Sequence, residues 1–242
     1  MTKKAHITLA SHIADRIGLK GNKYRKFIFY SGNIWPDVSI MFLIKRHYIT
    51  NTFRHLERLI NWLNNRKEML SKEELLKGRY LLHLGKVNHF IADYFTLPHN
   101  ITFEGVKAHL IYERLLLQSL SEITENGKVE EVGSIEAKNC ETIDTYGAKD
   151  YYSLPDEAAA TYYSRDDYHR IGELIRKVKK DNNTLSILKF IIASHYEYLM
   201  KVKEAILLDC PSNKKAKTLV DLDSRYIVSV CTEAIQGIVS TN

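Results

Sequence analysis

The chain has 242 residues, enough for one large domain with its own apolar core. It carries 35 lysines and arginines against 29 acidic residues, and the resulting net charge of +6 is spread over short basic runs. This modest excess favours weak attraction to anionic substrates or membrane surfaces and argues against a dedicated nucleic-acid-binding stripe. The three cysteines, Cys140, Cys210 and Cys231, form no CxxC pair, which argues against a zinc knuckle or a disulfide framework and favours reduced thiols.

The N-terminal segment MTKKAHITLASHIADRIG does not read as a secretory signal. Its apolar residues are interrupted by His6, His12, Asp15 and Arg16, and no later stretch has the apolar length of a membrane span. We therefore expect a cytoplasmic protein without a transmembrane segment, whose contact with membranes is at most peripheral.

The first predicted helix covers residues 4–17 and ends at Gly18. An aromatic run within residues 24–33 then leads into Gly32-Asn33-Ile34-Trp35-Pro36-Asp37, which we interpret as a turn or loop because glycine and proline interrupt regular structure. Asp37 directly follows Pro36. On local evidence it serves equally well as the N-cap of a following helix or as a metal ligand.

Three helices follow at residues 50–66, 71–96 and 104–122. The first is amphipathic, and its His55 lies on or beside the apolar face. The second starts with a capping-box pattern, Ser71 and Glu74. Its Gly85 lies one turn before His89 and predicts that another helix approaches closely there.

The rest of the chain contributes no obvious ligand pattern. Residues 123–155 are polar and predict a loop or flap, and residues 156–242 carry helical periodicity over 157–180, 184–208 and 217–240. Strand alternation is absent from the sequence. We therefore expect an all-α, single multi-helix domain over residues 1–242, with the ligand-bearing helices in 1–122.

The stretch 85–113 concentrates side chains that bind metals, namely His89, Asp93, His99, His109 and Glu113. Residues four apart share one helix face, so His89 with Asp93, and His109 with Glu113, each present two ligands to one point. Either pair alone is common as a plain polar contact. Together, among apolar neighbours where an unpaired polar group is costly, they favour a zinc cluster.

The order His6, Asp37, His55, His89-x3-Asp93-x5-His99 and His109-x3-Glu113 resembles the zinc-dependent phospholipase C family of bacteria. That family shares its helical fold with single-strand-specific zinc nucleases. The resemblance covers the first half of the chain.

The resemblance implies two or three zinc ions. One would bind Asp37, His55, His89 and a bridging Asp93. A second would bind His99, His109 and Glu113. A third would bind His6, Asp93 and the backbone amine and carbonyl of the first residue, which is a tryptophan in secreted relatives and Met1 here.

The resemblance also implies the reaction. A hydroxide that bridges the metals would attack phosphorus in line, with Asp37 as the catalytic residue that orients or deprotonates it, and a phosphomonoester and an alcohol would result. Glu113 is typical of the phospholipases, whereas the nucleases more often have Asp at that position. The expected substrate is therefore a phosphodiester, preferably a phospholipid headgroup.

Two alternatives stay open. The first is a single-strand nuclease-like phosphodiesterase, which needs exposed aromatic platforms such as Trp35, Tyr94 or Phe95 to stack bases. The second is a catalytically silent, metal-stabilised binding protein, in which side chains fill every metal position. A di-iron bundle fits poorly because neither His89 nor His109 follows a Glu at the spacing that such sites use.

Overall fold

The computed structural model describes residues 1–39, 47–69, 71, 74, 77–100, 106–126, 173, 182–207 and 212–240. These residues form seven α-helices and one 3₁₀ helix, namely α1 (Lys3–Arg16), α2 (Lys23–Val38), α4 (Ile49–Lys67), α6 (Gly78–Tyr94), η1 (Leu97–His99), α7 (Val106–Asn126), α11 (Asn182–Leu207) and α12 (Ser212–Val239). No strand occurs in these ranges, and the predicted all-α fold is confirmed.

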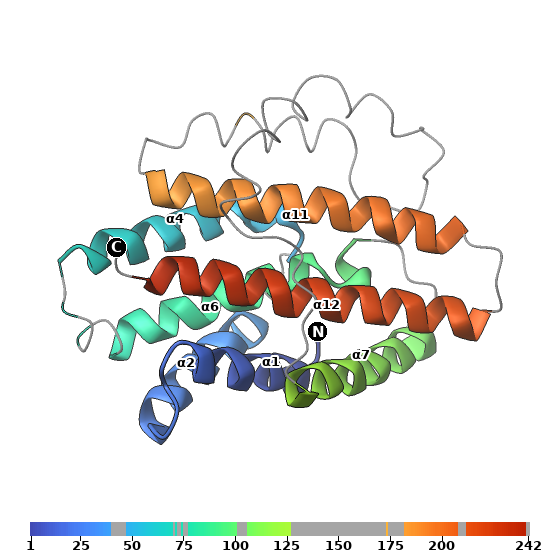
Figure 1. Ribbon diagram of the computed structural model, residues 1–242, viewed down its shortest axis with the longest axis horizontal. Helices are drawn as coiled ribbons and strands as arrows, with labels where there is room; N and C mark the ends of the chain where they lie inside the picture. Colours follow the sequence, from blue (N-terminus) through green and yellow to red (C-terminus); the bar gives the residue numbers. More distant parts are fainter. Residues whose placement is uncertain are drawn as a thin grey trace.

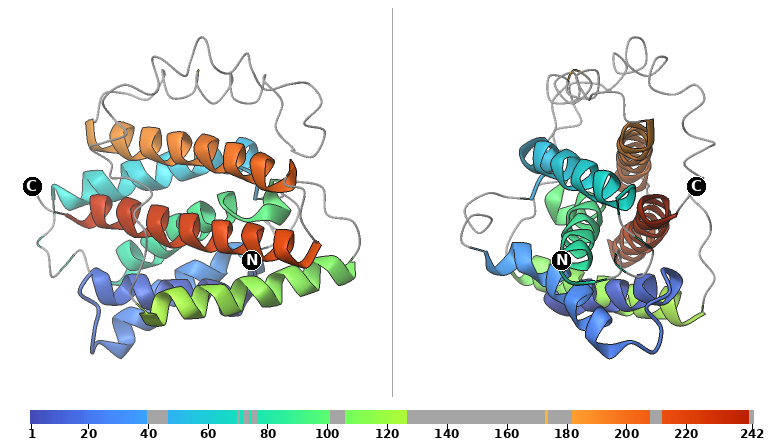
Figure 2. Two further views of the ribbon diagram at one scale, coloured as in Figure 1. Left: turned by 45° about the vertical axis from the view of Figure 1, so that its right-hand side comes forward. Right: turned by 90° about the vertical axis from the view of Figure 1, so that its left-hand side faces the viewer.

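Helix α6 lies inside the bundle, in contact with α2, α4 and α12 (Figure 1). The end-on view of Figure 2 shows α1, α2 and α7 on one side of α6, with α4, α11 and α12 on the others. Twelve residues of α6 are buried, which explains why its sequence is apolar around most of its circumference. The ligand candidates His89 and Asp93 are therefore held in the centre of the fold.

Helices α2 and α6 touch backbone to backbone. A Cβ added at Gly85 would lie 2.3 Å from the Phe29 carbonyl oxygen, and one added at Gly32 would lie 2.3 Å from the Leu82 carbonyl oxygen. Only glycine fits at such a crossing. The close approach predicted at Gly85 is confirmed.

The loop predicted around Pro36 is wrong, because residues 23–38 form the continuous helix α2. Pro36 lies in the last turn, where the missing N–H costs a single hydrogen bond, and Gly32 is favoured by the contact with α6. Asp37 accordingly sits inside the last turn of α2 and is not the N-cap of a following helix.

The helix predicted over 71–96 also starts later than expected. Ser71 and Glu74 do form the predicted box, since the Ser71 N–H and hydroxyl donate to Glu74 Oε2 at 3.0 and 2.8 Å. Helix α6 itself begins at Gly78, whose φ of +43° interrupts helical geometry there.

The remaining helices match the predictions at 4–17, 50–66, 104–122, 184–208 and 217–240 within a few residues. Apart from Glu173, the expected helix at 157–180 lies outside the described residues, as do most of the polar segment 123–155, Cys140 and Cys210. Cys231 is buried as a free thiol. Among the described helices, none is long and apolar enough to cross a bilayer.

Candidate metal centre

Asp93 is the centre of a buried group of side chains. Its side chain is 1% exposed, and imidazole nitrogens surround its two oxygens. Oδ2 lies 3.2 Å from His89 Nε2 and 3.0 Å from His47 Nδ1, and Oδ1 lies 3.4 Å from His6 Nε2. Asp93 therefore touches histidines from three different parts of the chain.

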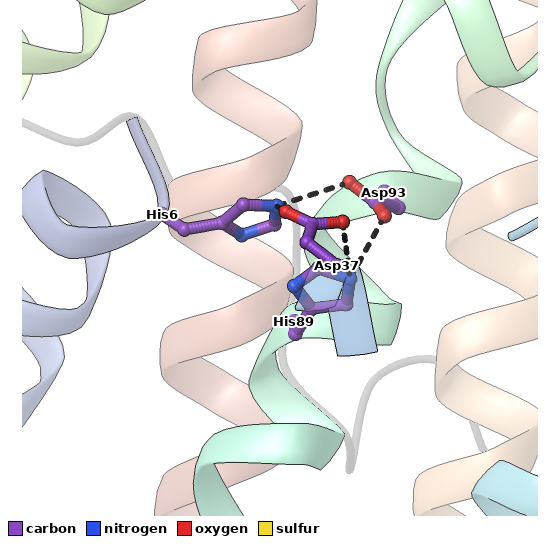
Figure 3. Close-up of side chains that lie close together, drawn as sticks. All are labelled: His6, Asp37, His89 and Asp93. Atoms are coloured by element: carbon purple, nitrogen blue, oxygen red, sulfur yellow. Dashed lines mark ion pairs between the residues drawn. The ribbon is translucent and has the colours of Figure 1, made fainter. Parts of the chain in front are cut away.

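Four of the predicted ligands form a compact set. His6, Asp37, His89 and Asp93 each offer one ligand atom, and these atoms all lie within 4.8 Å of one another. Figure 3 shows that the four side chains point toward a common centre from α1, α2 and α6. Asp37 completes the set, with Oδ1 3.6 Å from His89 Nε2 and Oδ2 3.8 Å from His6 Nε2.

A hydrogen bond to the backbone of α2 fixes the orientation of the His89 ring. Its Nδ1 lies 2.7 Å from the Asn33 carbonyl oxygen of α2, so Nδ1–H donates and the lone pair of Nε2 faces the two aspartates. Asn33 is itself held, because its amide donates to the Phe29 carbonyl and its Oδ1 accepts from Asn88. The glycine crossing thus places a backbone carbonyl where metal-binding histidines commonly find one.

His47 also joins the group, although the sequence did not single it out. It lies just before α4, and its Nδ1 is 3.1 Å from His89 Nε2 and 3.9 Å from Asp37 Oδ1. No partner at helical spacing marks His47 in the sequence. Its position between the two ligand-bearing segments was the only available signal.

His55 lies outside the cluster. It is half-buried in α4, its ring packs in a T-shaped arrangement with that of Phe90, and the charges of Arg58 and Lys86 act on it. Two cations are an unfavourable setting for a metal ion. The described contacts therefore do not bring His55 into the cluster, whereas His47 Nδ1 lies 3.0 Å from Asp93 Oδ2.

The second predicted ligand set is only partly assembled. His99, at the end of η1, lies 3.7 Å from Asp93 Oδ1. His109 and Glu113 pair with each other across one turn of α7 at 3.4 Å, and His109 is 41% exposed. The Glu113 charge acts on the Met1 amine, which itself lies 3.3 Å from Asp93 Oδ1. His6, Asp93 and the first residue, the groups implied for a third zinc, therefore lie together.

Burial and charge set the protonation of the cluster. Burial alone would raise the pKa of Asp93, but the Met1 ammonium and the imidazoles of His99, His89 and His6 hold it well below its usual range. Burial, helped by the neighbouring His89, lowers the pKa of His6 to about 3. The site thus combines an ionised carboxylate with a neutral imidazole, the forms that bind a metal.

The donor set fits a zinc ion. Neither ring nitrogen of His6 has a well-formed hydrogen bond among the described residues, although the side chain is fully buried. A buried imidazole without a partner is costly, and a cation beside Nε2 would remove that cost. Imidazole nitrogen and carboxylate oxygen are suitable zinc ligands.

A second polar cluster, centred on Asp223, connects the elements around the site. Asp223 of α12 is fully buried and accepts hydrogen bonds from the Leu97 N–H, the Tyr198 hydroxyl and, in a very short contact, the Tyr112 hydroxyl. It ties η1, which carries His99, to α7 and α11. No sequence pattern indicates this role of Asp223, because a lone Asp on an amphipathic helix is usually solvated.

The aromatic residues named as possible base platforms divide into two groups. Tyr94 and Phe95 are fully buried, and Trp35 is 49% exposed with the Lys86 ammonium over its ring. Core packing therefore accounts for Tyr94 and Phe95.

Comparison with known families decides what this arrangement belongs to. A model of the family described as zinc dependent phospholipase C matches residues 5–205, well over half of the chain. The chain belongs to the zinc-dependent phospholipase C family. No curated protein and no solved structure matches it significantly. Membership agrees with the helical bundle and with the buried His and Asp cluster, and it makes zinc the metal to test first.

Proposed function

We propose that this protein is a zinc-dependent phosphodiester hydrolase that acts on phospholipid headgroups. The convergence of His6, Asp37, His89 and Asp93 in one largely buried cluster carries the proposal. Family membership supports the reaction class, and the cluster supplies imidazole and carboxylate groups suited to zinc, of which we propose two or three ions.

The ligand assignment follows the geometry. We assign Asp93 as the bridging carboxylate because both of its oxygens face imidazoles. We propose His47 as a ligand in place of His55, since its Nδ1 lies 3.0 Å from Asp93 Oδ2 and 3.1 Å from His89 Nε2. His99, His109 and Glu113 remain the proposed second set.

Zinc bound here would lower the pKa of a coordinated water and neutralise charge on the phosphate oxygens. We propose Asp37 as the residue that handles the proton. Burial, with Asp93 nearby, raises the pKa of its carboxyl, and 24% of the side chain remains exposed. A carboxylate at the open side can orient the attacking water and accept its proton. Asp93 and His89, by contrast, are buried.

Solvent access to the metal ligands distinguishes a catalytic metal site from a structural one. Asp37, His99 and His109 are 24%, 21% and 41% exposed, whereas His6, His89 and Asp93 are buried. The cluster therefore has an open side, which favours turnover over a purely structural metal.

The test combines metal analysis with a substrate panel. Purified protein is assayed for bound zinc and for hydrolysis of phosphatidylcholine in mixed micelles, bis(p-nitrophenyl) phosphate and single-stranded DNA. We expect phosphatidylcholine and the chromogenic diester to be cleaved. We also expect Asp93→Asn to lower both zinc content and rate by about a hundredfold or more.

Asp15→Asn is the matched control, because Asp15 is a half-exposed carboxylate that pairs with Lys26. It should leave both measurements unchanged. Diesterase activity that survives Asp93→Asn and His89→Ala would contradict the mechanism, and cleavage of DNA alone would move the protein to the nuclease-like alternative.

A further inference from the structure

The outer face of α2 is apolar. The structure exposes eight large apolar side chains among its described residues, and four of them lie on this helix: Tyr24 72%, Phe27 67%, Trp35 49% and Val38 47%. The opposite face, with Phe29, is buried against α6. Exposed apolar side chains gathered on one helix face mark a candidate surface for contact with a partner or a membrane.

The spacing makes these residues one stripe. At about 100° per residue they fall within about 80° of the helix circumference, along about 21 Å of its length. We call Tyr24, Phe27, Trp35 and Val38 the α2 stripe. Asp37 lies between Trp35 and Val38 in sequence, on a flank of the helix between its buried and exposed sides, and its side chain is 24% exposed.

Basic residues accompany the stripe. The segment from Leu19 to Val38 carries Lys20, Lys23, Arg25 and Lys26, and its acid is Asp37. Lys20 and Lys23 are exposed, and Lys86 of α6 places its ammonium 5.4 Å from the Trp35 ring centroid. Tyrosine and tryptophan beside lysines are typical of a surface that lies in the headgroup region of a bilayer.

We propose that the α2 stripe docks the protein on a phospholipid surface, with the aromatic side chains in the headgroup region and the lysines on anionic lipids. A second copy of this chain fits less well, because two stripes packed face to face would bring both sets of lysines together. The proposal rests on the proposed function for its role in catalysis. Docking would bring headgroups to the flank of α2 on which Asp37 lies.

The experiment separates docking from hydrolysis. Binding is measured by co-sedimentation with vesicles of phosphatidylcholine, with and without phosphatidylserine. Hydrolysis is measured on soluble bis(p-nitrophenyl) phosphate. We expect Phe27→Ser and Tyr24→Ser each to weaken vesicle binding about tenfold and to leave the soluble reaction unchanged. Leu207→Ser is the matched control, because Leu207 is 71% exposed at the end of α11.

Two further variants sharpen the test. Lys23→Glu should weaken binding to vesicles with phosphatidylserine more than binding to phosphatidylcholine alone. Trp62→Phe leaves Trp35 as the single tryptophan, and its emission should shift to the blue on vesicles and be quenched by brominated lipid acyl chains.

The outcomes are distinct. Vesicle binding equal in wild type, Phe27→Ser and Tyr24→Ser overturns the proposal, even if the diester is hydrolysed. A lowered melting temperature with unchanged vesicle binding would show that the stripe holds another segment of this chain, and a change in oligomeric state would show a second copy. Docking without hydrolysis would instead refute the proposed function and leave the docking surface standing.

Discussion

Gly85→Ala tests how the fold prepares His89. The added Cβ would lie 2.3 Å from the Phe29 carbonyl oxygen and 2.9 Å from the Asn33 nitrogen and the Gly32 Cα. All three are backbone atoms, so no side chain can rotate away. Restoring an ordinary contact of about 3.4 Å requires α2 and α6 to separate by about 1 Å.

The expected change in unfolding free energy for Gly85→Ala is the sum of opposing effects. Alanine gains about 1 kcal/mol over glycine inside a helix. Overpacking at a rigid contact costs about 1–3 kcal/mol, and losing the 2.7 Å bond from His89 to the Asn33 carbonyl costs about 1 kcal/mol more. We expect a net loss of about 2 kcal/mol in unfolding free energy. Zinc affinity should fall about tenfold to a hundredfold, because His89 loses its orienting partner.

Urea denaturation of the metal-free protein and zinc titration measure the two effects. Gly32→Ala should behave alike, since its Cβ meets the Leu82 carbonyl oxygen at the same crossing. Ser31→Ala, at the half-exposed neighbouring position, should change stability by less than about 0.5 kcal/mol. A Gly85→Ala protein that is more stable than wild type and binds zinc normally would refute the reasoning.

Three further predictions concern other parts of the structure. His47→Ala should reduce zinc binding by at least about tenfold, whereas His55→Ala should leave it unchanged; the reverse result in a zinc titration would restore the sequence-based assignment. Asp223→Ala should cost about 3 kcal/mol in urea denaturation because three buried donors lose their acceptor, and a cost no larger than that of Asp221→Ala would contradict this role. Burial lowers the pKa of His195 to about 3. Between about pH 6.5 and about pH 3 the unfolded chain therefore binds more protons than the folded chain, and the unfolding free energy should fall as the pH is lowered, by up to about 1.4 kcal/mol per pH unit. His195→Gln should flatten this acid limb, and an unchanged pH profile would contradict the burial argument.

Much of the architecture could be predicted because it depends on local periodicity. The i, i+4 pair His89 and Asp93, the glycine at 85 and most helix positions follow from one helix at a time. Pro36 misled the prediction because a proline in a last turn costs little when the preceding Gly32 gains a close contact with α6.

The missed residues depend on contacts between distant segments. His47 reaches the cluster through the packing of the N-terminal end of α4, not through any spacing in its own sequence. Asp223 becomes an anchor only once α12 meets η1 and α7. Such roles are set by tertiary packing, so single-segment patterns cannot indicate them.

The zinc site itself can be observed most directly by anomalous diffraction at the zinc absorption edge from crystals of the zinc-loaded protein. The proposed centre predicts a strong anomalous peak among His6, His47, Asp37, His89 and Asp93. A map with no peak there, or with zinc only at surface histidines such as His12, would contradict it.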